Sequence, residues 1–110
     1  MVDLVNTIGG ITRLNTHNYQ SWQSRIKSYL EGQDLWEIVN GNDTKPPENA
    51  EKLKIWKVKA AKAMYVLKST IEDWLLGRIG DDDTPNMAWD TFASLFSKTN
   101  NARRQYGKNF

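Results

Sequence analysis

The stretch NYQSWQSRIKSYLEGQDLW, residues 18–36, decides the fold of this chain. If a helix begins at Tyr19, apolar side chains recur at spacings of three and four residues and share one face. The members of this face are Tyr19, Trp22, Ile26, Tyr29 and Leu30. Asn18 precedes the helix and is a suitable N-cap, because its side-chain carbonyl can accept from a free N–H of the first turn. A helix with such a stripe is not stable alone in water, so other segments must cover it.

The apolar surface continues past the end of this helix. Gly32 stands where a residue with a left-handed backbone would close the helix. Leu35 and Trp36 follow shortly after it. We therefore expect the chain to turn a corner here and to keep contributing to the same core.

Length and composition exclude several classes of protein. The chain has 110 residues, which is a usual length for one domain, and five Trp, four Tyr and three Phe supply large core side chains. Its 15 basic and 13 acidic residues nearly balance, which gives no argument by itself for nucleic acid or membrane. The absence of Cys excludes disulfides, thiol catalysis and Cys-ligated zinc. No apolar run has the length of a membrane span and no signal peptide is evident, so we expect a soluble cytoplasmic domain with no membrane partner.

A second and longer helical pattern covers residues 50–68, after a loop over residues 40–49. Its apolar stripe consists of Leu53, Trp56, Ala60, Ala63, Met64 and Leu67. Six lysines are spread around the helix, which favours a solvated surface over a focused phosphate-binding face. Val58 and Tyr65 lie nearly opposite the stripe, where they either touch a flanking segment or a partner, or are simply exposed.

Residues 69–79 (STIEDWLLGRI) predict a further short helix. Ser69 and Glu72 have the spacing of a capping box, which indicates that a new helix starts at Ser69. The segment is more apolar than one buried face requires, which is a weak sign of a partner surface. The residues predicted to form a protein interface are Tyr65, Trp74, Leu76 and Ile79.

The last clear helix covers residues 85–98, with Thr84 as its cap and Pro85 at its first position. Three aspartates, residues 81–83, precede it. Acidic residues before a helix interact well with its positive end, and this explanation is favoured over a metal site because the cluster lacks the ligand pattern of a calcium loop.

The two ends of the chain remain outside these helices. Residues 1–14 form either an extended arm or a small hairpin with its turn at Gly9-Gly10. The predicted organisation is an arm over 1–14, a helical domain over 15–99 and a basic tail over 100–110. If the tail binds RNA, the binding residues are Lys98, Arg103, Arg104 and Lys108, with Tyr106 among them.

These patterns together predict an all-α fold, a compact bundle of about five helices, two of them short, with an N-terminal arm or small hairpin. The predicted core and motif residues are Tyr19, Trp22, Ile26, Leu30, Leu35, Trp36, Trp56, Leu67, Trp89, Phe92 and Phe96. Aromatic stripes at helical spacing usually form a core, so a ligand-binding role is not predicted for them.

The sequence gives no sign of an enzyme. His17 is the only histidine, no base is placed against a nucleophile, and Gly9-Gly10 is not followed by the residues of a phosphate-binding loop. We therefore predict no catalytic residue, no metal, no cofactor and no small-molecule substrate.

The segment LNTHNYQSWQSRIKSYLEGQDLWEIV, residues 14–39, resembles the start of the Gag polyprotein of plant copia-type LTR retrotransposons. The shared features are Leu14, Asn15, Asn18, Tyr19, Trp22, Ile26, Leu30, Leu35 and Trp36. Trp56 with Ala60, Ala63 and Leu67 resembles the second block of that family, and PNMAWDTFASLF, residues 85–96, resembles the third. The three blocks occur in the right order over about residues 12–104.

The resemblance implies the N-terminal half of a capsid-like domain. Gag capsids are all-helical and self-associate into particles around RNA. The second capsid half and the zinc knuckle of the family are not in this sequence, so it is expected to be either a truncated piece or a short domesticated gene. The leading hypothesis is a structural module that binds itself or a related Gag protein, and the alternative is an RNA-binding module that uses the basic tail.

Overall fold

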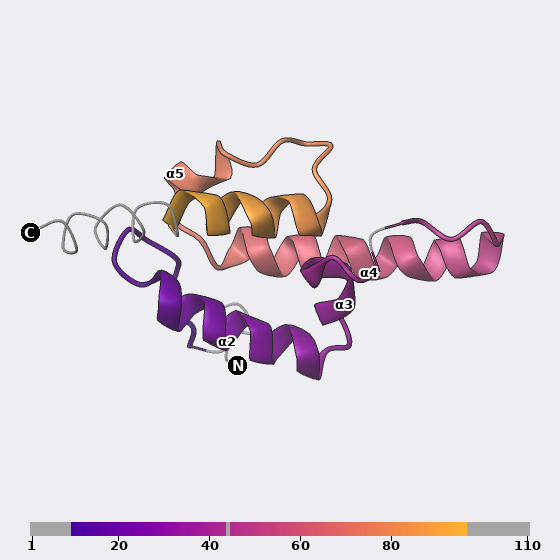
Figure 1. Cartoon of the computed structure of the whole chain (residues 1–110), viewed down its shortest axis with the longest axis horizontal. Helices are drawn as coiled ribbons and strands as arrows, with labels where there is room; N and C mark the ends of the chain where they lie inside the picture. The colour runs from indigo at the N-terminus through magenta and orange to yellow at the C-terminus, as the bar shows by residue number, and fades with distance from the viewer. Residues whose placement is uncertain (1–9, 44, 97–110) are drawn as a thin grey trace, which may run out of the picture.

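The computed structural model describes residues 10–43 and 45–96. Within these ranges the regular secondary-structure elements are helices, and no strand is formed. The helices are α2 (Tyr19–Gly32), α3 (Trp36–Asn40), α4 (Ala50–Ser69), α5 (Asp73–Leu76) and a final helix that begins at Pro85 and is described as far as residue 96 (Figure 1). The predicted all-α bundle with about five helices, two of them short, is confirmed. No helix of the described ranges is both long and apolar enough to cross a membrane.

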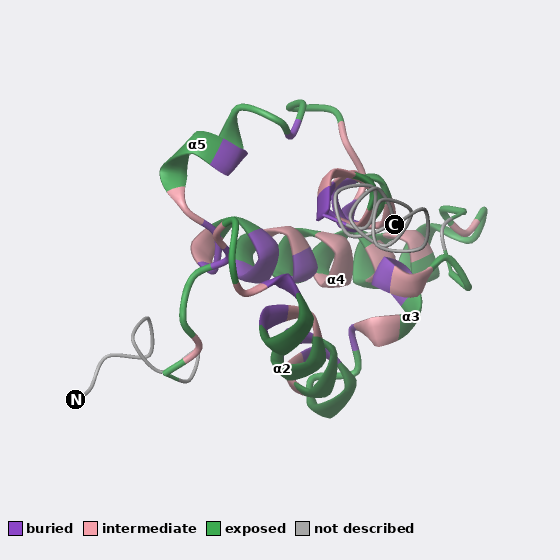
Figure 2. Ribbon diagram, turned by 60° about the vertical axis from the view of Figure 1, so that its left-hand side comes forward, coloured by how far each residue is buried: buried purple, intermediate pink, exposed green. Residues whose placement is uncertain are grey.

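The apolar face of α2 forms the centre of the core. Trp22, Ile26 and Leu30 are almost fully buried, and Tyr19 is 7% exposed. Figure 2 shows the buried residues of α2 directed toward α4, while the opposite side of α2 is exposed. The apolar face predicted from the sequence is therefore the face of α2 that packs into the core.

The start of α2 differs from the prediction, because the side chain of Asn18 does not cap it. Its oxygen accepts from the N–H of Asn15 at 2.8 Å, and its amide group donates to the carbonyl of Arg13 at 2.9 Å. Asn18 thus holds the segment before the helix in place instead of the first turn of the helix.

The end of α2 lies beyond the predicted residue. Gly32 is still helical, and the left-handed backbone occurs at Asp34, with φ of 60°. The N–H of Leu35 donates to the carbonyl of Leu30 at 2.8 Å, and that of Asp34 donates to Glu31 at 3.2 Å. This is the hydrogen-bond pattern of a Schellman motif, which directs the chain from α2 into α3.

Aromatic rings join α2 and α3 to the final helix. The ring centroids of Trp22 and Trp89 are 5.6 Å apart, and those of Tyr19 and Phe96 are 5.4 Å apart. Trp36 meets Trp89 edge to face at 5.3 Å. These distances and orientations are those of favourable aromatic pairs. The first and third blocks of the resemblance therefore meet in one aromatic cluster.

A short backbone pairing ties the segment before α2 to the end of α4. Leu14 forms a parallel bridge with Ile71, and both side chains are buried. Leu14 donates to Thr70 at 2.8 Å and accepts from Glu72 at 3.1 Å. The last residue of the predicted arm is thus part of the core, whereas the predicted Gly9-Gly10 hairpin extends outside the described residues.

The first half of α4 extends beyond the other helices (Figure 1). Asn49 caps it by accepting from the N–H groups of Glu51 and Lys52 at 3.0 and 3.1 Å. Trp56, which was predicted as core, is only half-buried and lies outside the core cluster, with its indole nitrogen 3.4 Å from the carbonyl oxygen of Asp43. The prediction for Trp56 is wrong because this first half of α4 extends beyond the other helices, which leaves it less covered than the second half (Figure 1).

The core includes nine of the other predicted residues as buried side chains, and Trp36 packs against them partly buried. The nine are Tyr19, Trp22, Ile26, Leu30, Leu35, Leu67, Trp89, Phe92 and Phe96. Val66 and Leu14 were not among the predicted core residues and are buried as well.

Candidate protein-interaction site

α5 presents two large apolar side chains to solvent. Trp74 is 46% exposed and Leu76 is 39% exposed, whereas Leu75 between them is completely buried. We call Trp74 and Leu76 the α5 knob. The indole nitrogen of Trp74 donates to a carboxylate oxygen of Glu72 at 3.1 Å, so its orientation is held by its own N-cap residue.

The helix restart predicted at Ser69 is wrong. α4 continues through Ser69, and α5 begins four residues later with Glu72 as its N-cap. The reason is that Thr70 and Glu72 use their backbone groups to pair with Leu14, which keeps Ile71 extended.

The four predicted interface residues do not share one surface. Ile79 is 9% exposed and belongs to the core cluster, so it is not available to a partner in this structure. It is buried because the chain turns back after α5 toward the core. Tyr65 is 57% exposed and lies on α4, a different helix from the one that carries the α5 knob.

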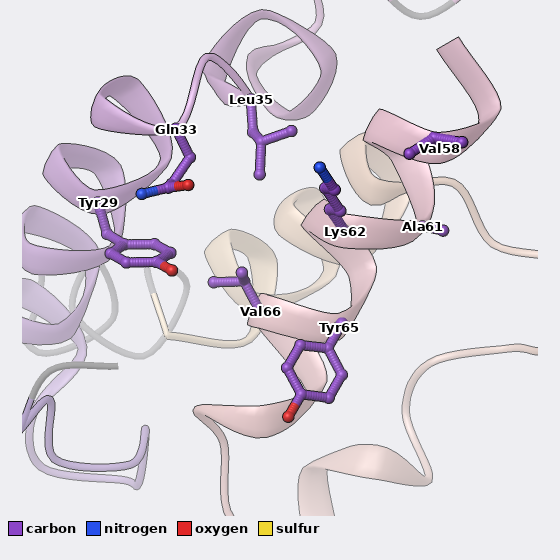
Figure 3. Close-up of a pocket in the computed structure, with 8 residues that line it drawn as sticks. All are labelled: Tyr29, Gln33, Leu35, Val58, Ala61, Lys62, Tyr65 and Val66. Atoms are coloured by element: carbon purple, nitrogen blue, oxygen red, sulfur yellow. The ribbon is translucent and has the colours of Figure 1, made fainter. Parts of the chain in front are cut away.

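A groove lies between the C-terminal end of α2 and one face of α4 (Figure 3). It has a volume of about 410 Å³. We call it the α2–α4 groove; its lining residues are Tyr29, Gln33, Leu35, Val58, Ala61, Lys62, Tyr65 and Val66. Figure 3 shows Tyr29, Gln33 and Leu35 on one side and the α4 residues on the other. Tyr65, the only predicted interface residue among them, thus belongs to a groove.

One lysine lines the groove and another lies beside it. Beside the groove, Lys59 pairs with Asp34 at 2.8 Å, and this contact with Lys59 lowers the pKa of the Asp34 carboxyl below its usual value. Lys62, which lines the groove, forms no such pair within the described residues. The groove therefore combines apolar walls with one positive charge that has no ion-pair partner in the part of the chain that the structure describes.

Charge is unevenly distributed between the two surfaces. α4 carries six lysines and one acidic residue, Glu51. Residues 71–84, which include the α5 knob, carry five acidic residues and one arginine. The two segments have opposite charge although the whole chain is nearly neutral.

The described residues contain no cluster of side chains suited to a metal ion. No three His, Asp or Glu side chains come together there as a metal would require. In the triple-aspartate segment, Asp83 accepts from the N–H of Gly80 at 2.9 Å. Thr84 accepts from the N–H of Met87 at 3.1 Å, which confirms its predicted role as a cap.

A family comparison identifies the chain. The family model described as gag-polypeptide of LTR copia-type matches residues 26–109, most of the sequence. The chain belongs to this family. The resemblance to copia-type Gag is thereby confirmed, although the matched range begins inside α2 and leaves out Leu14 to Trp22. Searches among curated proteins and among solved structures gave no significant match.

Membership makes this copia-type Gag chain a structural module of a retrotransposon polyprotein. The plant origin and the truncated or domesticated status stay predictions, because the family description does not mention them. The predicted RNA-binding residues, Lys98, Arg103, Arg104 and Lys108, lie outside the described residues.

Sequence reasoning missed the α2–α4 groove. Val58 and Tyr65 were singled out because they lie opposite the apolar stripe of their helix, and they are seven residues apart, so they share one face. What the sequence did not show is that Tyr29 and Gln33 of the preceding helices would stand across from them. That placement depends on how α2 packs against α4, which is a tertiary contact.

Proposed function

We propose that this Gag chain is a non-enzymatic capsid-type module that acts through contacts with copies of itself or with a related Gag protein. The observation that carries the proposal is the exposure of Trp74 and Leu76 on either side of a buried Leu75. Large aromatic side chains are enriched at protein interfaces and often dominate their energy. We expect the module to act in the cytoplasm, without a membrane partner or a small-molecule substrate.

The anchoring of the α5 knob supports this proposal. Leu75 and Ile79 fix the segment in the core, and Glu72 orients the indole of Trp74. A side chain that is already ordered loses little conformational entropy on binding, so preorganisation favours association.

The test is the mass of the chain in solution, measured by sedimentation or light scattering over a wide concentration range. We expect the mass to rise with concentration. A variant with Trp74→Ser and Leu76→Ser is expected to associate less and to keep its helicity by circular dichroism. Ile55→Ser is the matched control, because Ile55 is also exposed, at 59%, and does not belong to the α5 knob.

Two outcomes contradict the proposal in different ways. Loss of helicity in the double variant would show that Trp74 and Leu76 are structural, so they are not the contact residues. A strict monomer at every concentration would exclude self-association. Binding of the chain to a full-length copia-type Gag protein then decides whether a hetero-partner exists.

RNA binding through the basic tail is the second proposal, and it depends on the sequence alone. Binding driven by phosphate contacts weakens steeply as salt rises. A titration with single-stranded RNA at low salt tests it, and absence of binding there would exclude it.

A further inference from the structure

We propose that the α5 knob of one copy inserts into the α2–α4 groove of a second copy, so that copies join head to tail. This inference rests on the proposed self-association and specifies its contact. It follows from the shape, the charge and the placement of the two surfaces.

The groove has the size and the lining of a site for apolar side chains. Its volume of about 410 Å³ falls within the range of about 300–1,000 Å³ for ligand pockets. Leu35, Val58 and Val66 give it aliphatic walls, and two tyrosines extend them. A groove of this kind accepts an indole, which is what Trp74 presents. Leu76 is two residues further along the same helix and does not face in the same direction as Trp74.

The charges of the two surfaces indicate that the α5 knob of another copy occupies the groove. Two acidic residues, Glu72 and Asp73, directly precede Trp74. Lys62 lines the groove and has no ion pair within the described residues. An apolar knob with acidic residues at its base therefore matches an apolar groove that carries a lysine, and both surfaces are present in every copy.

A single copy does not fill its own groove. Both overall views place α5 and α2 on opposite sides of α4 (Figures 1 and 2). No α5 residue lines the groove, and the buried Leu75 holds α5 where it is. Since the knob and the groove lie on opposite sides of α4, one partner does not fill both, so their contact is heterologous and a row of copies keeps one knob and one groove open at its ends. Such a contact builds rings or open chains of copies instead of closed two-fold dimers.

The contact is expected to be weak. One inserted indole buries less than the standard interface of about 1,600 Å². Opposite charges increase the rate of encounter and are screened by salt, so association is expected to decrease as ionic strength rises.

The first experiment compares variants of the full chain by sedimentation. Val58→Glu places a negative charge in the groove opposite Glu72 and Asp73, so we expect the dissociation constant to rise more than about tenfold. Ile55→Glu is the matched control, because it makes the same change at an exposed position of α4 that does not line the groove. It is expected to associate like the wild type.

A charge exchange tests the pairing directly. Lys62→Glu and Asp73→Lys are each expected to weaken association, and the two changes in one chain are expected to restore it. Lys57→Glu makes the same change of charge outside the groove. If it weakens association at all, Asp73→Lys should not restore association. Rescue by the second charge would not occur if either change only damaged the fold.

Mixing variants tests the head-to-tail geometry. A Val58→Glu chain keeps its knob, and a Trp74→Ser, Leu76→Ser chain keeps its groove. Neither should associate alone, and an equal mixture should form a dimer that grows no further. A wild type that associates while the mixture stays monomeric, or while the groove variants have no effect, would overturn this contact and leave self-association standing. A monomeric wild type would overturn both.

Discussion

The indole nitrogen of Trp22 donates a buried hydrogen bond of 2.8 Å to the backbone carbonyl of Thr70. The same carbonyl accepts from the N–H of Leu14, also at 2.8 Å. The hydroxyl of Thr70 donates in turn to the carbonyl of Val66 at 2.8 Å. One carbonyl at the end of α4 thus joins the segment before α2 to α2 itself, and it does so inside the core.

Replacing Trp22 with Phe should destabilise the fold more than replacing Trp89 with Phe. Both side chains are buried and lose the same atoms, but only Trp22 loses an indole hydrogen bond within the described structure. A typical hydrogen bond contributes about 1 kcal/mol net, so we expect a difference of about that size in the free energy of unfolding. Urea denaturation followed by circular dichroism measures it. Equal losses in both variants would show that the hydrogen bond contributes nothing beyond packing.

Leu14→Ala is expected to lower the free energy of unfolding by about 2–5 kcal/mol, because Leu14 is completely buried and its removal leaves a cavity. Ile11→Ala serves as the comparison, since Ile11 is only partly buried against the core and should cost less. The same denaturation measurement applies. A change at Leu14 without effect would mean that the segment before α2 detaches from the core at no cost.

Periodicity predicted the helices well because the spacing of apolar residues along one face of a helix is a local property of the sequence. Tyr19, Trp22, Ile26 and Leu30 follow one face and are buried together. Trp56 lies on the apolar face of α4 as predicted, but α2 is shorter than α4 and does not cover this residue, so the prediction that Trp56 is in the core failed. Leu14 was placed in an arm because its parallel pairing with Ile71 is non-local, and nothing in either segment alone indicates it.

The exposed apolar side chains were predicted only in part, since a buried stripe and an exposed one look alike in a sequence. Leu76 and Ile79 are three residues apart, yet one is exposed and the other is in the core. α5 ends at Leu76, so the helical spacing that would have placed both on one face does not continue to Ile79. The end of a four-residue helix is set by tertiary contacts more than by propensity.

Asn49→Ala should destabilise the fold by about 1 kcal/mol, because its side chain accepts from two backbone N–H groups at the start of α4. Asn49→Asp keeps an accepting oxygen at the same position and is expected to retain stability. Thermal or urea unfolding compares the two. If the Asp variant loses as much as the Ala variant, capping is not the source of the effect.

The last prediction concerns alkaline pH and Tyr19. Burial, with a smaller contribution from the carboxylate of Asp90, raises the pKa of the Tyr19 phenol above the ordinary value of a tyrosine, about 10. The unfolded chain then loses this proton at a lower pH than the folded chain, so stability falls as pH rises from about 10 through the folded pKa.

Tyr19→Phe removes this proton, and the Tyr19 hydroxyl has no hydrogen-bond partner in the described residues. We therefore expect the free energies of unfolding of wild type and variant to differ by a constant below pH 9 and to shift in favour of the variant above pH 10, which urea titrations at fixed pH measure. A difference that stays constant through this range would show that the phenol is not buried in the folded chain.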